Sequence, residues 1–283
     1  MVLSTKALSA KPGSWRAILS SLATFYERRW LIKYFVQRQM VRGYRGSYLG
    51  LVWAFLAPLM MVVMLTLVFS EVIGIKFREV TGDSTLNFGL FLYCGMIPFL
   101  AYQQALVQGV NVIRRNSDLV QKVVFPMEIL PLTTVLTSLL QNTLGLGALL
   151  LVLTVLEQRL HWTILLLPLV VIPQLLFTLG LGYLMAVAGT YVPDVRETLR
   201  TFVRGTFWIT PILWPAGRVP ESLSFLVDYN PLAFLVGAYR ALILDGELPG
   251  AMAGLYFSLF AVAVFGVGFV VFNRVKHNFA DQL

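Results

Sequence analysis

Five stretches of this chain carry no charged side chain over a length sufficient to cross a lipid bilayer, and this feature constrains the fold most. A crossing helix needs about 20 mostly apolar residues. The 283 residues are 58% hydrophobic and 13% charged, whereas soluble domains carry about 25% charged residues. Such a chain cannot cover its apolar surface in water, which excludes a soluble enzyme, a secreted disulfide-stabilised domain and a disordered chain. The uncharged stretches are 48–70, 84–113, 129–156, 161–193 and 251–273.

A sixth and weaker span is expected at 198–214, although Arg200 and Arg204 lie near its start. Long basic side chains at a helix end can reach the membrane surface while their stems stay in hydrocarbon. The predicted fold class is therefore all-α integral membrane, with six transmembrane helices in a domain that covers residues 48–283.

The distribution of charge predicts the orientation of these spans. The segments before span one, after spans two and four, and after the last span hold 17 of the 22 Lys and Arg residues. Their net charge is +11, and the opposite face has −3, which gives the formal total of +8. Because positively charged loops stay in the cytoplasm, we expect both termini there. The positive charge then reports orientation and gives no reason to expect a nucleic-acid partner.

Residues 1–47 form a basic arm with an amphipathic helical pattern. Trp15, Ile18, Leu22 and Phe25 share one face of this helix, and most of its charged residues lie off that face. A basic amphipathic helix lies along the membrane surface. Two interpretations remain open: a simple lipid anchor, or an interface helix that frames a substrate entrance or a partner dock.

The stretch 215–250 carries too many charges to span, yet it contains an apolar, helix-compatible segment at 231–244. Asn230 suits the N-cap of this helix and Pro231 its first position. Apolar runs of 10–14 residues often re-enter the membrane or lie at its interface. We therefore expect a re-entrant segment between spans five and six, which forms an outer gate.

The sequence contains no motif for catalysis or metal binding. It has no Gly-Lys dipeptide, so it lacks a phosphate-binding P-loop. His161 and His277 are expected on opposite faces of the membrane, and no His/Cys set has metal-ligand spacing. Ionisable residues inside spans mark proton relays and ion-coupled pumps, and the middle of each predicted span lacks them. We expect no catalytic residue, metal or cofactor in this chain, and an energy source on a partner.

Two predicted spans carry uncharged polar residues at helical spacing, Gln104 and Gln108 on one and Thr134 and Gln141 on the other. Hydrogen bonds between helices, worth about 0.6–2 kcal/mol each, explain any single residue of this kind. Together the two stripes favour a wet, uncharged lumen, in which nearby aromatic rings either stack on sugars or belong to the interfacial belt or core. The candidate channel-lining residues are Trp53, Tyr93, Phe99, Tyr102, Gln104, Gln108, Thr134, Gln141, Phe207 and Trp208.

Several short segments together resemble the membrane subunits of polysaccharide-exporting ATP-binding-cassette transporters. The resemblance covers about residues 28–283, and within that family the sequence is most similar to O-antigen exporters. Each segment alone is weakly specific, whereas their order and spacing are specific. The segments are 44–50 (YRGSYLG), 116–126 (NSDLVQKVVFP), 128–131 (EILP), 192–196 (VPDVR), 210–212 (TPI), 229–232 (YNPL), 239–240 (YR) and 278–281 (NFAD).

The resemblance implies a half-transporter in the bacterial cytoplasmic (inner) membrane. Two copies of the chain would form the channel, and two copies of a separate nucleotide-binding ATPase would bind ATP and magnesium. The implied substrate is a glycan linked to a polyprenyl pyrophosphate or a similar carrier, which moves from the inner to the outer leaflet. The alternatives are a permease of the same family for teichoic acid, capsule, drug or lipid, and an integral membrane glycan transferase.

The resemblance also implies roles for particular residues. The coupling loop to the ATPase maps to 116–126, and its candidate residues are Asn116, Asp118, Leu119, Val120, Lys122, Phe125 and Pro126. The outer gate maps to 215–250, and its candidates are Tyr229, Asn230, Pro231 and Tyr239. Arg38, Arg42 and Arg45 are expected to attract the carrier pyrophosphate where it enters from the cytoplasmic leaflet. The topology of the chain would by itself also place these arginines on that face.

Overall fold

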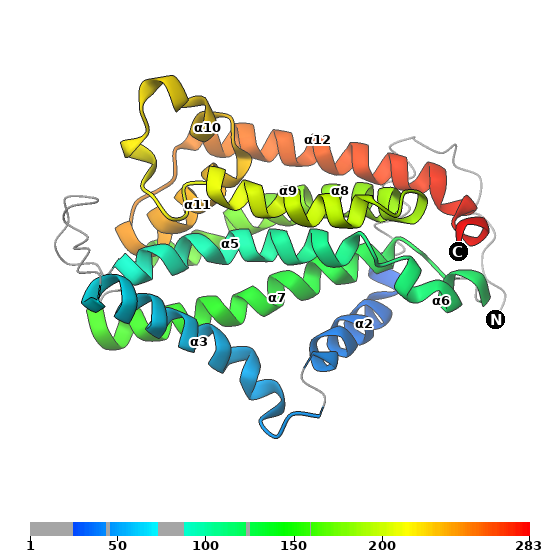
Figure 1. The fold of residues 1–283 in the computed structure, drawn as a ribbon, viewed down its shortest axis with the longest axis horizontal. Helices are drawn as coiled ribbons and strands as arrows, with labels where there is room; N and C mark the ends of the chain where they lie inside the picture. Colours follow the sequence, from blue (N-terminus) through cyan, green and yellow to red (C-terminus); the bar gives the residue numbers. More distant parts are fainter. Residues whose placement is uncertain (1–24, 44–45, 73–87, 123–124, 159) are drawn as a thin grey trace.

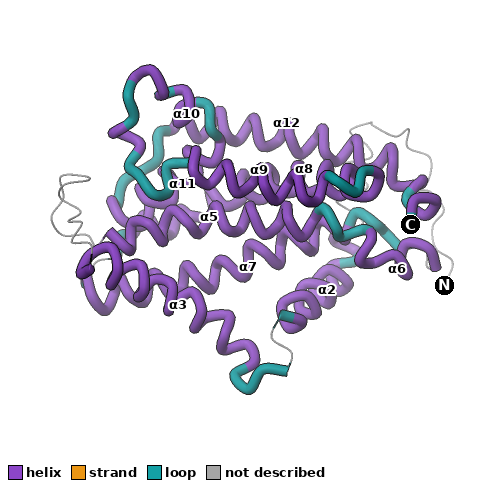
Figure 2. The backbone as a smooth tube through the Cα atoms, viewed as in Figure 1, coloured by secondary structure: helices purple, strands orange, loops and turns teal. Residues whose placement is uncertain are grey.

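The computed structural model describes residues 25–43, 46–72, 88–122, 125–158 and 160–283, and all regular secondary structure in these ranges is helical (Figures 1 and 2). Four helices are long and apolar enough to cross a membrane: Phe88–Gly109, Ile129–Val155, Trp162–Tyr191 and Ala251–Asn278. They coincide with four of the predicted spans. The prediction of an all-helical membrane protein with several crossing helices is therefore confirmed.

These crossings are built around α5 (Phe88–Gly109), α7 (Ile129–Val152), α8 (Leu167–Tyr191) and α12 (Ala251–Val275). The helices α8 and α12 are in backbone contact, because glycine leaves room at two facing positions. A Cβ atom at Gly180 would lie 2.6 Å from the backbone of Val264, and one at Gly268 would collide with the carbonyl group of Gly180. Small residues allow such close approach of helices in membranes.

The two other predicted spans are shorter in the structure. The apolar helix α3 (Trp53–Thr66) continues as a π-helix over Leu67–Val72, and α9 (Val195–Ile209) has 15 residues. The helix α9 ends where it does because the residue before a proline is disfavoured in the helical conformation. Thr210, which precedes Pro211, has extended backbone angles. An arrangement with six spans therefore remains a prediction.

The helix α2 (Arg29–Arg42) lies against α7 and buries Phe35 and Val36. Figure 1 shows α2 at the same end of the bundle as α6 (Ser117–Lys122) and the C-terminal residues. We call this the α6 end. Of the amphipathic pattern in the arm, Trp15, Ile18 and Leu22 lie outside the described residues.

The stretch 215–250 lies mainly at the opposite end of the bundle, where it forms α10 (Phe225–Asp228) and α11 (Pro231–Arg240) (Figure 1). We call this the α11 end. The predicted cap of α11 is confirmed, because Asn230 Oδ1 accepts a hydrogen bond of 3.0 Å from Leu232 N. A π-helix (Ala241–Asp245) extends α11 up to the left-handed Gly246. Most residues of α11 are buried against α5, α8 and α12, so this segment is an integral part of the core.

Candidate functional site

The two polar stripes predicted from the sequence face each other in the structure. They lie on α5 and α7, and Asn142 Nδ2 donates a hydrogen bond of 3.2 Å to Gln104 Oε1. Around this contact, residues of α3, α5 and α7 line an open cavity of ≈ 520 Å³. Its lining includes Tyr93, Gln104, Gln108 and Gln141. Four of the candidate channel residues therefore share one cavity, which we call the polar groove.

A smaller cavity of ≈ 110 Å³ continues from the polar groove at the α6 end. Arg38 and Arg42 of α2 and Arg115 after α5 line it together with Gln108 and Thr134. Gln108 lines both cavities, so the groove and this cationic pocket share a wall. Two of the arginines predicted to meet the carrier lie in this pocket, whereas Arg45 lies outside the described residues.

The cationic pocket has its shape because α2 is fixed on its neighbours. Gln39 Nε2 donates a hydrogen bond of 3.2 Å to Thr133 Oγ1 on α7. The rings of Phe35 and Phe125 pack edge to face with centroids 5.5 Å apart. Sequence reasoning missed Arg115, although the basic loop after the second predicted span was the signal that could have found it.

The remaining channel candidates have different surroundings in the single chain. Phe99 and Tyr102 are buried, and they pack on Phe207 (5.4 Å) and Phe177 (5.9 Å) respectively. Trp53 and Trp208 are exposed on the surface. The Thr134 hydroxyl donates to Leu130 O within its own helix, at 3.0 Å. Contact of these residues with a substrate remains a prediction.

The predicted coupling loop contains the short helix α6, which is attached to the bundle on two sides. Arg114 Nη2 donates a hydrogen bond of 2.9 Å to Thr190 O at the end of α8. Val120 of α6 is buried in the cluster of apolar residues at this end, whereas Asp118 is exposed. The loop thus presents one face outward and anchors the other in the core.

The C-terminal residues form a support for α6 that sequence reasoning missed. Lys276 forms an ion pair with Glu128, directly before α7. Phe279 is 0% exposed and packs on Phe272 (5.4 Å) and Tyr191 (6.2 Å). The last turn, Ala280–Gln282, contacts α6. The resemblance of residues 278–281 to the family was the signal that could have found this contact.

Arg240 organises the α11 end, and it is only 7% exposed. Its Nη1 and Nη2 atoms each donate a hydrogen bond of 2.7 Å, to Pro211 O and Ile212 O, and Nε donates one of 3.3 Å to Phe91 O. The guanidinium also lies 3.5 Å from the ring centroid of Phe91. It fits because position 95 is glycine: a Cβ atom there would lie 2.5 Å from Nη2.

A second buried hydrogen-bond chain joins three helices at the same end. The Tyr239 hydroxyl of α11 donates to Gln174 Oε1 of α8 at 2.8 Å, and Gln174 Nε2 donates to Pro98 O of α5 at 3.2 Å. Asn230 Nδ2 also donates to Thr210 Oγ1 at 3.2 Å. Of the outer-gate candidates, Asn230 and Tyr239 thus hold packed helices together, whereas Tyr229 is exposed.

No group of three or more His, Cys, Asp or Glu residues within the described ranges is arranged to hold a metal ion. Cys94 is buried and free. The polar side chains that line the polar groove and the cationic pocket are amides, arginines, a threonine and a tyrosine, and alanine, methionine, proline and leucine line the rest of the groove. This arrangement can bind and guide a polar or anionic molecule.

Together these features define a polytopic, all-α membrane protein with a polar groove and a cationic pocket between its helices. Its sequence matches the ABC-2 type transporter family over residues 31–244. The chain belongs to this family, which confirms the resemblance seen in the sequence.

Three curated relatives show the range of this similarity. The chain is 28% identical to the O-antigen export system permease protein RfbA of Myxococcus xanthus over 260 residues, which cover 91% of this chain and 97% of that protein. It is 26% identical to RfbA of Klebsiella pneumoniae, over 85% of this chain and 90% of that one. It is 24% identical to the polysialic acid transport protein KpsM of Escherichia coli, over 80% of this chain and 85% of that protein.

Proposed function

We propose that this chain is the permease subunit of an ATP-driven exporter of a lipid-linked polysaccharide such as O-antigen. Two copies form the transporter with two copies of a separate ATPase, which supplies the nucleotide site that this sequence lacks. The chain crosses the inner membrane six times, with α3 and α9 as the short crossings and both termini in the cytoplasm. The segment 215–250 is the re-entrant outer gate.

The observation that carries this proposal is the wall that the polar groove and the cationic pocket share at Gln108. Arg38, Arg42 and Arg115 suit a pyrophosphate, because charge-assisted hydrogen bonds to guanidinium groups are strong and frequently bidentate. Amide side chains such as Gln104 and Gln141 suit the hydroxyl groups of a glycan. The cationic pocket therefore suits the pyrophosphate and the polar groove suits the sugar chain. The two cavities lie one after the other along a single path.

The coupling role belongs to α6 and its flanking residues in this proposal. The ATPase contacts the exposed face of α6, which includes Asp118. Movement of α6 reaches α8 through the bond from Arg114 to Thr190. It reaches α12 through the C-terminal turn that contacts α6. The loop 116–126 thus acts on two crossing helices at once.

Reconstitution with the cognate ATPase in proteoliposomes tests the proposal. A double variant, Arg38→Gln and Arg42→Gln, removes two cations of the pocket. Loss of even one charge-assisted hydrogen bond, worth about 1.5–3 kcal/mol, predicts a fall of tenfold or more in the appearance of a polyprenyl-pyrophosphate glycan in the outer leaflet. Lys33→Gln, on α2 but outside the pocket, is the matched control. Unchanged export in the double variant would contradict the proposal.

Capsular polysaccharide is the second candidate substrate, and the similarity to KpsM, named as a polysialic acid transport protein, favours an anionic chain of this kind. A substrate that is not linked to a pyrophosphate would not depend on the cationic pocket. ATPase stimulation separates the two: a short polyprenyl-pyrophosphate glycan stimulates an O-antigen type exporter, and the double variant abolishes this effect. If an anionic polysaccharide alone stimulates the ATPase, and does so equally in the double variant, capsular polysaccharide is the favoured substrate.

A further inference from the structure

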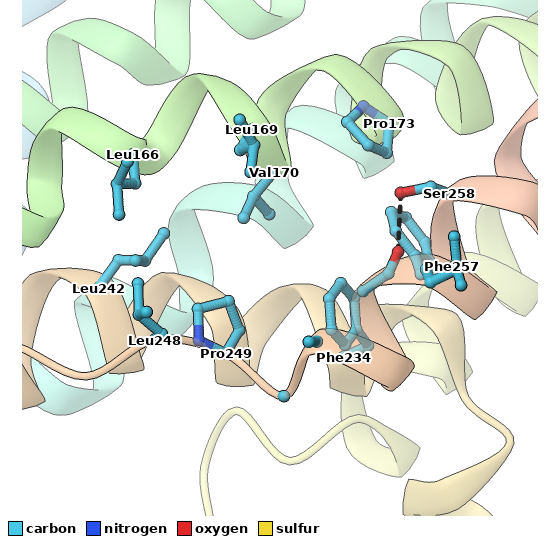
Figure 3. A pocket seen from close by; sticks show the side chains of 14 residues that line it. Leu166, Leu169, Val170, Pro173, Phe234, Leu242, Leu248, Pro249, Phe257 and Ser258 are labelled. Carbon is cyan, nitrogen blue, oxygen red and sulfur yellow. Dashed lines mark hydrogen bonds between the residues drawn. The ribbon is translucent and has the colours of Figure 1, made fainter.

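An apolar groove of ≈ 390 Å³ opens on the side of the bundle between α8, α11 and α12 (Figure 3). Leu169, Val170 and Pro173 of α8 form one wall, and Phe234 of α11 and Leu248 stand opposite, as Figure 3 shows. The lining contains no charged side chain. Its one hydroxyl group, on Ser258, is satisfied within α12 by a bond of 2.7 Å to Gly254 O.

The surroundings of this groove are lipid-facing. It lies on α8 and α12, and most residues in the apolar windows of these two crossing helices are not covered by the rest of the chain. At its rim, Leu169 is 75% exposed and Leu248 is 63% exposed. An apolar cavity does not hold ordered water, so hydrocarbon is what fills a groove that opens into the bilayer.

An aromatic residue indicates the depth of the groove. Trp162 is exposed, and Trp gathers where the membrane meets water. Trp162 comes four residues before Leu166 of the lining. The groove therefore begins at the level of the lipid head groups and extends into the acyl-chain region.

The charge at its head-group end selects among lipids. Glu247 is exposed and directly precedes Leu248 of the groove lining, whereas the charge of Asp245 acts on the buried Arg240. Carboxylates repel a pyrophosphate head group and attract an ammonium group. The geometry points to a binding site for one acyl chain of an amine-bearing phospholipid such as phosphatidylethanolamine, distinct from the path of the exported molecule. The bound chain packs α11 against α8 and α12 on their lipid-facing side.

Photocrosslinking in lipid nanodiscs tests this site without any glycan or ATPase. The probe is phosphatidylethanolamine with a diazirine in the middle of one acyl chain, and mass spectrometry locates the crosslinks. We expect them to concentrate in residues 166–173 and 248–258. Even labelling of every lipid-facing helix would overturn the proposal.

The decisive comparison is between the wild type and a variant in which a larger side chain fills the groove. A Cβ atom at Gly254 would meet Phe234 at an ordinary 3.7 Å, so Gly254→Leu fits and its branches occupy the groove. We expect severalfold less labelling in this variant, and wild-type labelling in Gly266→Leu, where a Cβ atom meets nothing within 4 Å on the same helix. Should Gly254→Leu not fold, Ser258→Leu fills the groove from its other side. Unchanged labelling in a folded filled variant would overturn the site.

The identity of the occupant is tested with a second probe. A polyprenyl phosphate with a diazirine in its chain is offered together with unlabelled phosphatidylethanolamine. Weak labelling of the groove by this probe supports the phospholipid assignment. Strong labelling that the phospholipid does not reduce would overturn it.

Discussion

Glu128 and Lys276, which are 148 residues apart in the sequence, form an ion pair at the α6 end. The two side chains are only 12% and 22% exposed, so each charge depends on the other more than it would on an open surface. The same pair joins the start of α7 to the turn that follows α12, Lys276–Asn278. It therefore closes the bundle next to α6.

Removal of either charge is expected to destabilise the protein. A hydrogen bond to a charged group contributes about 1.5–3 kcal/mol, and we expect a loss near the lower end for Glu128→Gln or Lys276→Met, because both groups keep some contact with solvent. Thermal unfolding in detergent measures this loss. The exchanged pair, Glu128→Lys with Lys276→Glu, is expected to recover stability, and single variants as stable as the wild type would contradict the assignment.

Phe279 is expected to be the most sensitive residue of the C-terminal tail. It is fully buried, and truncation of a buried phenylalanine to alanine typically costs about 3–5 kcal/mol. Phe279→Ala should therefore lower the unfolding temperature strongly, whereas Gln282→Ala, at an exposed position in the same tail, should not. Differential scanning fluorimetry in detergent distinguishes the two variants. Equal behaviour of both would show that the tail does not support α6.

The role of Arg240 predicts that lysine cannot replace it. A lysine carries one ammonium on a flexible stem, whereas the guanidinium fork reaches three separate carbonyl groups. Arg240→Lys is expected to leave at least one buried carbonyl unsatisfied, at about 1–3 kcal/mol, and to loosen 211–224. Limited trypsin digestion measures this as faster cleavage after Arg218.

Gly95→Ala provides an independent check on the same contact, because the added methyl group meets the guanidinium at 2.5 Å. It should reproduce the faster cleavage of Arg240→Lys. Gly266→Ala, on the open surface of α12, is the control. A wild-type cleavage rate in Gly95→Ala would contradict the packing of Arg240.

Gln174 and Tyr239 are expected to be energetically coupled. Gln174→Leu leaves the buried Tyr239 hydroxyl and the Pro98 carbonyl without their partner, which costs about 1–3 kcal/mol for an unsatisfied buried group. Tyr239→Phe in the Gln174→Leu background should cost less than in the wild type. A double-mutant cycle of unfolding free energies measures the coupling. Additive effects would exclude the bond.

The sequence alone predicted the elements whose signal is local. The long stretches without charged residues predict the positions of α5, α7, α8 and α12 in the sequence. The Asn230-Pro231 pair correctly predicts the start of α11. The helix α9 proved shorter than 198–214 at its C-terminal end, because Pro211 prevents the helix from continuing. Gln104 belongs to one predicted stripe, and its partner Asn142 is the residue after Gln141 of the other.

Contacts between distant segments could not be predicted in the same way. Nothing in the local pattern pairs Glu128 with Lys276, or Phe279 with Tyr191. In the sequence, Arg240 is one of the charges that argue against a span at 215–250. Its burial depends on the carbonyl groups of Pro211 and Ile212, which are available because α9 ends at Ile209.

The contact between Gly180 and Gly268 has a consequence for movement. Two helices whose backbones touch cannot slide or rotate past each other without a clash, so α8 and α12 must move as one rigid body. The walls of the polar groove come from α3, α5 and α7. Any widening of the groove is therefore expected between these three helices, while α8 and α12 follow the coupling loop together as one body.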